Sequence, residues 1–535
     1  MTWLPPALLA APVIALLALG LVPSRKANEA ARLVGRLTTF LAGFSLLVSI
    51  AAAVRVVTLG PMDAVFLQWT APVPIAVGFH VDAVAVVMMT LISFIGLVIA
   101  RYSATYLQGD ERQGRFFRWM SVTLGGTLLF VMSGNLVMLT AAWMLTSYGL
   151  HQLLTHYPDR TWAIWAARKK FLISRLGDAM LIAAVVLTFR TFGTTDYVAV
   201  FAAADAIHAG EGPGEWSMTI ISLLFVLGAM TKSAQFPFHS WLPDTMETPT
   251  PVSALMHAGV INAGGFLVIR LGPLVSLSPI ALDLLALMGG MTALLGSVVM
   301  LTQTSVKRSL AYSTIAQMGF MMLQCGMGAF SAALLHIVAH SAYKAHAFLS
   351  CGSVLDSAAG MKVSSPPATS RRRSLMAFAG ALSIAAGIVV GTFELFGISL
   401  IQKPGGAMLG LVMTLALTQL LWNGMASGVL WVAVRSISLA LLVMVAYTIS
   451  LIGVERLVAS STSHHVLVPS ILDVAVLVIV ALGFVAVFAL QALSGPLSNR
   501  RWFRALYVHA MNGFYIDIPA RRLTAWCYRQ AGPVQ

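Results

Sequence analysis

Apolar stretches long enough to cross a membrane recur along the whole chain and are separated by short polar segments. A transmembrane helix needs about 20 mostly apolar residues. The pattern therefore predicts fifteen spans, at residues 4–23, 34–58, 80–101, 116–133, 136–156, 168–190, 217–238, 249–270, 278–302, 309–328, 331–355, 376–401, 407–424, 427–453 and 470–493. No basic residue precedes the first stretch, so we interpret it as a retained helix and not as a cleaved signal. The expected fold is an all-α polytopic membrane protein.

The composition excludes several other classes of protein. Hydrophobic residues make up 58% of the 535 residues and charged residues 10%, whereas a soluble domain carries about 25% charge. A soluble enzyme, a disordered protein and a disulfide-rich secreted domain are therefore excluded. The three cysteines are too few and too scattered for a disulfide framework or a zinc site. The longest loop on the outer side, residues 191–216, is interpreted as a solvated connector. No other long hydrophilic stretch is found, which leaves no room for a soluble catalytic domain.

The net charge of +14 reflects topology more than a binding surface for nucleic acid. Of the 33 Lys and Arg residues, 24 fall in the tail and in loops that follow odd-numbered spans, and five fall in loops that follow even-numbered spans. Positive charge concentrates on the cytoplasmic side of membrane proteins. This bias predicts a bacterial cytoplasmic (inner) membrane protein with its N-terminus outside and its C-terminus in the cytoplasm. No nucleic-acid partner is expected, because the charge is spread over many short loops.

Ionisable residues inside predicted spans are the candidate functional groups, because each costs about 2.5–3.5 kcal/mol at the bilayer centre on insertion scales. Arg175 and Asp178 share one face of the sixth span, where a structural ion pair is the alternative interpretation. Lys232 lies in the seventh span, five residues before Pro237, which is expected to break the helix. Broken helices are tolerated in membranes where they line a polar cavity, so Lys232 is a candidate proton carrier. The alternative is a lysine whose ammonium group reaches the membrane interface.

Histidines and a second lysine extend this set. His257 lies in the eighth span, and His336, His340 and Lys344 share one stripe of the eleventh span at i, i+4 and i+8. Neutral imidazoles pass protons in either direction near pH 7. A satisfied polar core is one alternative and a zinc site is another, but no Asp, Glu or Cys shares the stripe, so neither metal nor cofactor is expected. Glu394 is a candidate end of the proton path.

Two predicted helix breaks suggest an internal repeat. One lies near Pro237 in the seventh span, and the other near Gly391 to Gly397, around Glu394 in the twelfth span. Five spans separate them, which is the spacing expected of two inverted five-helix repeats with transport sites in discontinuous helices. The predicted organisation is N-terminal transmembrane helices at 1–115, a first repeat (spans 4–8) at 116–270, a second repeat (spans 9–13) at 278–424, and C-terminal helices with a cytoplasmic amphipathic tail at 427–535.

Residues 227–244 (LGAMTKSAQFPFHSWLPD) and 249–258 (PTPVSALMHA) resemble the signature of antiporter-like membrane subunits, which include the proton-pumping subunits of respiratory complex I and of Mrp cation antiporters. Residues 174–178, 307–314 and the His336–His340–Lys344 stripe also match. The resemblance covers residues 75–400. It implies the repeat fold and a proton path through Lys232, His257, His336, His340 and Lys344.

The sequence departs from the pumping members of that family at informative positions. Met144 follows Trp143 where those members carry a Glu, and their twelfth-span Lys is missing around Glu394. The length and the missing Glu resemble a shorter branch, the membrane subunits of DAB inorganic-carbon accumulation systems. That resemblance implies a non-enzymatic subunit that conducts protons or Na⁺ across the lipid bilayer. It also implies a cytoplasmic zinc carbonic-anhydrase-like partner (DabA type) that hydrates CO₂ to bicarbonate. The alternative is a proton-pumping subunit of a respiratory NADH:quinone oxidoreductase or an Mrp-type cation/proton antiporter.

Overall fold

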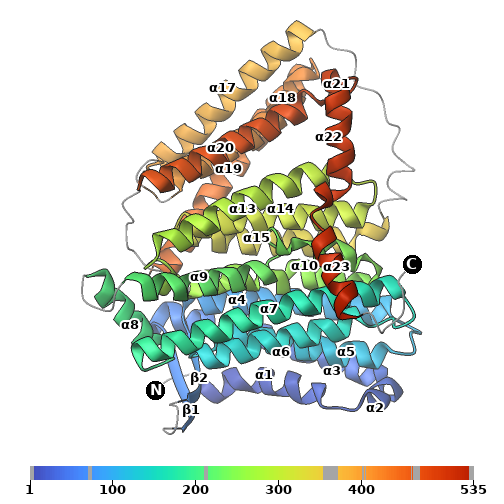
Figure 1. Ribbon diagram of the computed structural model, residues 1–535, viewed down its shortest axis with the longest axis vertical. Helices are drawn as coiled ribbons and strands as arrows, with labels where there is room; N and C mark the ends of the chain where they lie inside the picture. The colour runs from blue at the N-terminus through green and yellow to red at the C-terminus, as the bar shows by residue number, and fades with distance from the viewer. Residues whose placement is uncertain are drawn as a thin grey trace.

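The computed structural model describes residues 5–69, 75–209, 215–353, 371–400, 403, 405–459, 461 and 470–528. The helices lie side by side in a row of layers, and most of their axes are roughly parallel (Figure 1). The first half of this row contains α1 (Pro6–Gly20), α2 (Ser24–Glu29), α3 (Ala31–Leu59), α4 (Ala83–Tyr106), α5 (Gln113–Met132), α6 (Leu136–Leu154), α7 (Thr161–Phe192), α8 (Tyr197–His208) and α9 (Glu215–Lys232).

The second half continues the same row. It contains α10 (Thr250–Ala258), α11 (Ala263–Arg270), α12 (Gly272–Val275), α13 (Pro279–Met300), α14 (Val306–Gly326), α15 (Phe330–Leu349), α17 (Arg371–Leu395), α18 (Gly406–Ala426), α19 (Leu430–Val458), α20 (Ile471–Ala492) and α21 (Ser494–Leu497). The tail helices α22 (Arg501–Met511) and α23 (Ile518–Cys527) run across the ends of the other helices (Figure 1). Each of the fifteen predicted spans corresponds to a helix or, at α10–α11, to a broken pair of helices.

Nine of the described helical segments are long and apolar enough, by length and composition, to cross a membrane. The remaining predicted spans coincide with shorter helices (α1 and α9) or with more polar ones (α5, α6, α14 and α15). Helices α6, α14 and α15 carry the Ser, Thr and His side chains of the candidate site. Their polarity is tolerated because neighbouring helices enclose it. The expected helical membrane fold is confirmed.

Two segments differ from the sequence-based expectation. An antiparallel hairpin, β1 (Met62–Trp69) and β2 (Ile75–Val81), amends the all-α prediction. The two strands pair from Met62 with Val81 to Trp69 with Ile75, and Asn135, the N-cap of α6, donates to the Ala76 carbonyl at 2.6 Å. The predicted connector at 191–216 contains α8, which Asp196 caps. Tyr197, the first residue of α8, is buried, so this helix packs on the bundle instead of being fully solvated.

A buried ion pair fastens the start of α4 to the end of α11. Arg270 donates to both carboxylate oxygens of Asp82, each at 2.8 Å, and both side chains are buried. Asp82 also accepts from the Ala85 amide as the N-cap of α4. Arg270 is one of the five charges counted in loops after even-numbered spans, and the structure corrects that count, because the guanidinium lies inside the protein and is neutralised there.

The two ends of the molecule differ in how much apolar surface they expose. Helices α17–α20 form one end of the row (Figure 1), and their large side chains, such as Leu430, Trp431 and Ile471, are highly exposed. In a bilayer such side chains contact lipid. The largest group of buried apolar side chains extends mainly from α1 to α15, and the candidate site lies within it.

Candidate proton-transfer site

Lys232 is the last residue of α9, and its side chain is buried. The ammonium group donates to the Trp143 carbonyl at 3.0 Å and contacts the Ser147 hydroxyl at 2.6 Å, both on α6. It also lies 4.2 Å from the centre of the Trp143 ring. The helix ends at Lys232, and a separate 3-10 helix (Phe238–Trp241) follows Pro237, so the predicted interruption of the seventh span is present. Lys232 therefore faces the interior and does not extend toward the membrane interface.

The Trp143 side chain connects Lys232 to the carboxylate of Asp178. The Trp143 indole donates to Asp178 at 3.0 Å, and Asp178 pairs with Arg175 at 2.6 Å. Asp178 is buried, whereas the Arg175 side chain is 38% exposed. The predicted same-face pair is thus present, and it also adjoins the lysine site. Met144, next to Trp143, is half-buried and stands where the pumping members of the resembled family carry a Glu.

Lys169 and Lys170, which are among the 24 positive charges counted in the cytoplasmic loops and tail, are buried in α7, and this corrects the count. Lys170 donates to the Ser147 carbonyl at 2.7 Å and so reaches the same residue as Lys232. Lys169 points to the other side, where it pairs with Asp244 at 2.6 Å and with Asp517. Helix α7 begins at Thr161, seven residues before the predicted span, so both lysines lie more than one turn inside the helix.

Asp517 joins the C-terminal tail to the segment that follows Lys232. Its carboxylate accepts from Lys169 on α7 and from Arg521 on α23. Burial raises the pKa of the Asp517 carboxyl, but Lys169 and Arg521 more than offset this and hold the pKa below its usual value. The carboxylate therefore stays charged at neutral pH, and its contribution to docking of the tail is lost when strong acid protonates it.

The eighth span is also broken, which sequence analysis missed. Helix α10 ends at Ala258, Gly259 has non-helical dihedral angles, and α11 starts at Ala263. The Ser233 hydroxyl donates to the Ile261 carbonyl at 2.6 Å, which connects the end of α9 to this break. A broken helix exposes backbone groups to polar side chains inside the bundle.

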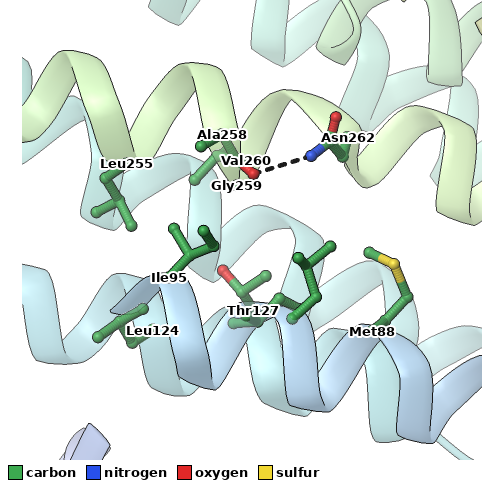
Figure 2. A pocket seen from close by; sticks show the side chains of 11 residues that line it. Met88, Ile95, Leu124, Thr127, Leu255, Ala258, Gly259, Val260 and Asn262 are labelled. Atoms are coloured by element: carbon green, nitrogen blue, oxygen red, sulfur yellow. Dashed lines mark hydrogen bonds between the residues drawn. The ribbon is translucent and has the colours of Figure 1, made fainter. Parts of the chain in front are cut away.

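Asn262, which directly precedes α11, bridges the break between α10 and α11. Its amide nitrogen donates to the Ala258 carbonyl at 3.0 Å (Figure 2) and to the Ser341 hydroxyl of α15 at 2.8 Å. A small, mostly apolar cavity adjoins the break and is lined by α4, α5 and α10, including Ile95 and Thr127 (Figure 2). Asn262 thus ties the broken eighth span to the helix that carries the histidine stripe.

The predicted histidines form a connected group. The His340 ring contacts the His257 carbonyl at 3.3 Å, and the rings of His336 and His340 stack with centroids 5.9 Å apart. The His257 ring contacts the Thr314 hydroxyl of α14 at 3.1 Å. One nitrogen each of His257 and His336 is buried without a hydrogen-bond partner among the described residues. Within those residues, no three His, Cys, Asp or Glu side chains gather as a metal site would require.

Lys344 is buried on α15 and turns toward α14. Its ammonium group contacts the Ser313 hydroxyl at 2.7 Å and the Leu310 carbonyl at 3.3 Å. Phe348, one turn further along α15, stacks on the His257 ring with centroids 4.3 Å apart. The structure therefore brings His257, His340 and Lys344 into one region between α10, α14 and α15.

Glu394 lies apart from these groups. It is exposed near the end of α17, and the helix continues through Gly391 to Leu395 without interruption. The predicted break in the twelfth span therefore falls at a helix end and not inside a helix. Gly397, which follows, has a positive φ of 69°, as is common just after a helix C-terminus.

Sequence analysis missed Lys170, Ser147 and Asn262. One available signal was spacing, because Lys170 lies eight residues before Asp178 and shares its helix face. Ser147 and Asn262 carry no such signal, because a single serine or asparagine in an apolar stretch has many ordinary roles. Their importance comes from contacts with distant helices.

Comparison with known proteins identifies relatives of this chain. Residues 133–442 match the family described as NADH:quinone oxidoreductase/Mrp antiporter, TM, and residues 66–117 match the N-terminus of chain 5 of NADH-ubiquinone oxidoreductase (complex I). The probable inorganic carbon transporter subunit DabB2 of Halothiobacillus neapolitanus is 40% identical over 84% of this chain and 80% of its own length. The probable inorganic carbon transporter subunit DabB of Hydrogenovibrio crunogenus is 34% identical over 88% of both chains.

More distant relatives cover less of either chain or share only the fold. NADH-quinone oxidoreductase subunit L of Mycobacterium tuberculosis is 39% identical over 52% of this chain and 43% of its own. Among solved structures, the Mrp complex from Dietzia sp. contains a chain that is similar over 98% of this protein and 57% of that chain, with 22% identity and a TM-score of 0.59. The archaeal membrane-bound sulfane sulfur reductase matches with 18% identity over 95% of this chain and 99% of its own, with a TM-score of 0.57.

Proposed function

The chain belongs to the NADH:quinone oxidoreductase/Mrp antiporter transmembrane family, and from this premise we propose that it conducts protons or Na⁺ to energise inorganic carbon uptake. In this proposal, the ion gradient drives hydration of CO₂ to bicarbonate in a cytoplasmic zinc carbonic-anhydrase-like partner. The chain itself supplies the membrane path and carries no catalytic site.

The extent of the match to the two probable inorganic carbon transporter subunits carries this proposal. That similarity runs through most of both chains, whereas similarity to the NADH-quinone oxidoreductase subunit covers about half of each. The side chain of Met144 supports the same direction, because no carboxylate stands beside Trp143 on α6 to attract a proton to Lys232.

The proposed path has two parts. The first contains Asp178 and Lys232, where α9 ends before Pro237. The second contains His257, His336, His340 and Lys344, and Glu394 is proposed as an exit at the exposed end of α17. Ser233, Ile261 and Asn262 join the two parts through hydrogen bonds across the broken eighth span. In the proposed orientation, the tail helices lie in the cytoplasm, where the partner binds.

Growth of cells that lack carbonic anhydrase tests the function. Such cells, given this chain and its partner, are expected to grow in air, and cells given the partner alone are not. Lys232→Met and His340→Ala are expected to abolish growth while the protein remains inserted, because each removes a group that accepts a proton. Growth with the partner alone would refute the proposal, and growth of both variants would remove these residues from the path.

A respiratory or Mrp-type subunit is the second candidate. The observation that favours it is the shared fold along nearly the whole chain with a subunit of the Mrp complex. Purification from the native membrane separates the two candidates. Co-purification of quinone-reducing activity or of further antiporter subunits supports this alternative, and a zinc-containing soluble partner supports carbon uptake.

A further inference from the structure

A second buried lysine, Lys170 on α7, contacts the same residue of α6 as Lys232. Lys170 donates to the backbone carbonyl of Ser147 at 2.7 Å, and Lys232 contacts the hydroxyl of that same residue at 2.6 Å. Lys170 is 3% exposed and Lys232 is 6% exposed. A single serine of α6 therefore anchors two amino groups from two different helices, away from water.

The charges around this pair do not balance two ammonium ions. The ionisable groups that interact with the two lysines are His151 on α6, and Arg175 and Asp178 on α7 itself. Asp178 is occupied by Arg175 at 2.6 Å and by the Trp143 indole at 3.0 Å. In the described part of the chain, no carboxylate contacts either lysine nitrogen. Two cations in a weakly screened interior repel each other strongly, so the pair favours a single shared proton.

We propose that Lys170 is a second proton-binding site, which loads and empties Lys232 from the side of the C-terminal tail. This inference rests on the proposed function. A transfer breaks one N–H bond on Lys170 and forms one on the neutral amine of Lys232. The pair keeps one positive charge throughout, and no electrons are exchanged.

The position of Lys170 explains the side from which protons arrive. The neighbouring Lys169 points to Asp244 and to Asp517 of the tail, so this turn of α7 lies between the interior and the tail. His151, one turn beyond Ser147 on α6, is half-buried and has a ring nitrogen without a hydrogen-bond partner among the described residues. It is placed to exchange protons between Lys170 and the aqueous side.

Proton flux tests this role. The full chain, reconstituted with its partner in vesicles that contain a pH-sensitive dye, is compared as wild type, Lys170→Met, Lys170→Gln and Lys170→Arg. All three variants are expected to lose at least about tenfold in flux, because methionine and glutamine bind no proton and arginine does not release one. Lys26→Met, which removes an exposed positive charge, is expected to conduct like the wild type.

The pH profile separates proton exchange from a packing role. Without a neighbouring cation, Lys232 keeps its proton at higher pH, so the residual flux of Lys170→Met and Lys170→Gln is expected to shift toward alkaline pH. Wild-type flux in both neutral variants would overturn the inference, and so would full rescue by Lys170→Arg, which would indicate a charge needed for position alone. If the wild type moves no protons, the proposed function itself fails, which is a distinguishable result.

Discussion

The two buried lysines of the proposed path are held in similar ways but in different electrostatic surroundings. Lys232 is bound by a backbone carbonyl and the Ser147 hydroxyl of α6, and Lys344 by a backbone carbonyl and the Ser313 hydroxyl of α14. In each case, one adjacent helix supplies both contacts. Lys232 ends a broken helix, whereas Lys344 lies within the continuous helix α15.

Their neighbours differ in charge. Lys232 and Lys170 both contact Ser147, and the Trp143 indole beside Lys232 donates a hydrogen bond to Asp178. Lys344 lies beside histidines, which are neutral when buried without an acidic partner. The comparison suggests that the first lysine is controlled by charges and the second by a chain of neutral hydrogen-bonding groups. A conduit built this way can change the protonation of one lysine without directly changing that of the other.

The largest effect is expected from Asp178→Asn. The change removes the carboxylate that balances Arg175 and leaves the lysine pocket more positive, which disfavours a proton on Lys232. Flux in vesicles is expected to fall at least about tenfold, equivalent to ~1.4 kcal/mol. Asp159→Asn, at an exposed loop position, serves as the matched control. Unchanged flux in Asp178→Asn would mean that the two lysines are not distinguished by charge.

Intermediate and unequal effects are expected from Ser147→Ala and Ser313→Ala. A hydrogen bond to a charged group contributes about 1.5–3 kcal/mol. Both variants lose such a contact, but the Ser147 hydroxyl also holds Lys232 beside the backbone carbonyl that binds Lys170, so its loss is expected to lower flux more than the loss of Ser313. Flux measured over a range of pH checks this order. If both variants lost the same amount of flux, the contact of Lys170 with Ser147 would not explain any difference between the two lysine sites.

The smallest effect is expected from Glu394→Gln. Glu394 is exposed at the end of α17, in contrast to the enclosed lysines, so neutralising it changes little around them. Proton flux is expected to fall by less than about twofold, because water can take over the role of an exposed exit carboxylate, and thermal stability is expected to stay at the wild-type level. A loss as large as that of Asp178→Asn would contradict this comparison, because it would make the exposed exit as important as the enclosed lysines.

Much of the fold could be predicted because each span is encoded locally. Lipid requires an apolar stretch of a certain length, and the fifteen stretches found in the sequence coincide with helices. The hairpin β1–β2 and the helix α8 were not predicted, because both are short and gain their stability from packing on the ends of longer helices. The break at Gly259 was missed because its compensating contacts, Asn262 with Ser341 and Ser233 with Ile261, come from other helices.

The sequence by itself determined the membrane class, the helix positions and the identity of most buried ionisable groups, because hydropathy and helical spacing act over a few turns. Only the tertiary structure decided which of these groups meet. It placed Lys170 and Lys232 on one serine, connected Asp178 to Lys232 through an indole, and left Glu394 exposed. The physical reason is that the interactions between charges depend on distance and burial. Both are set by the packing of helices that lie far apart in the sequence.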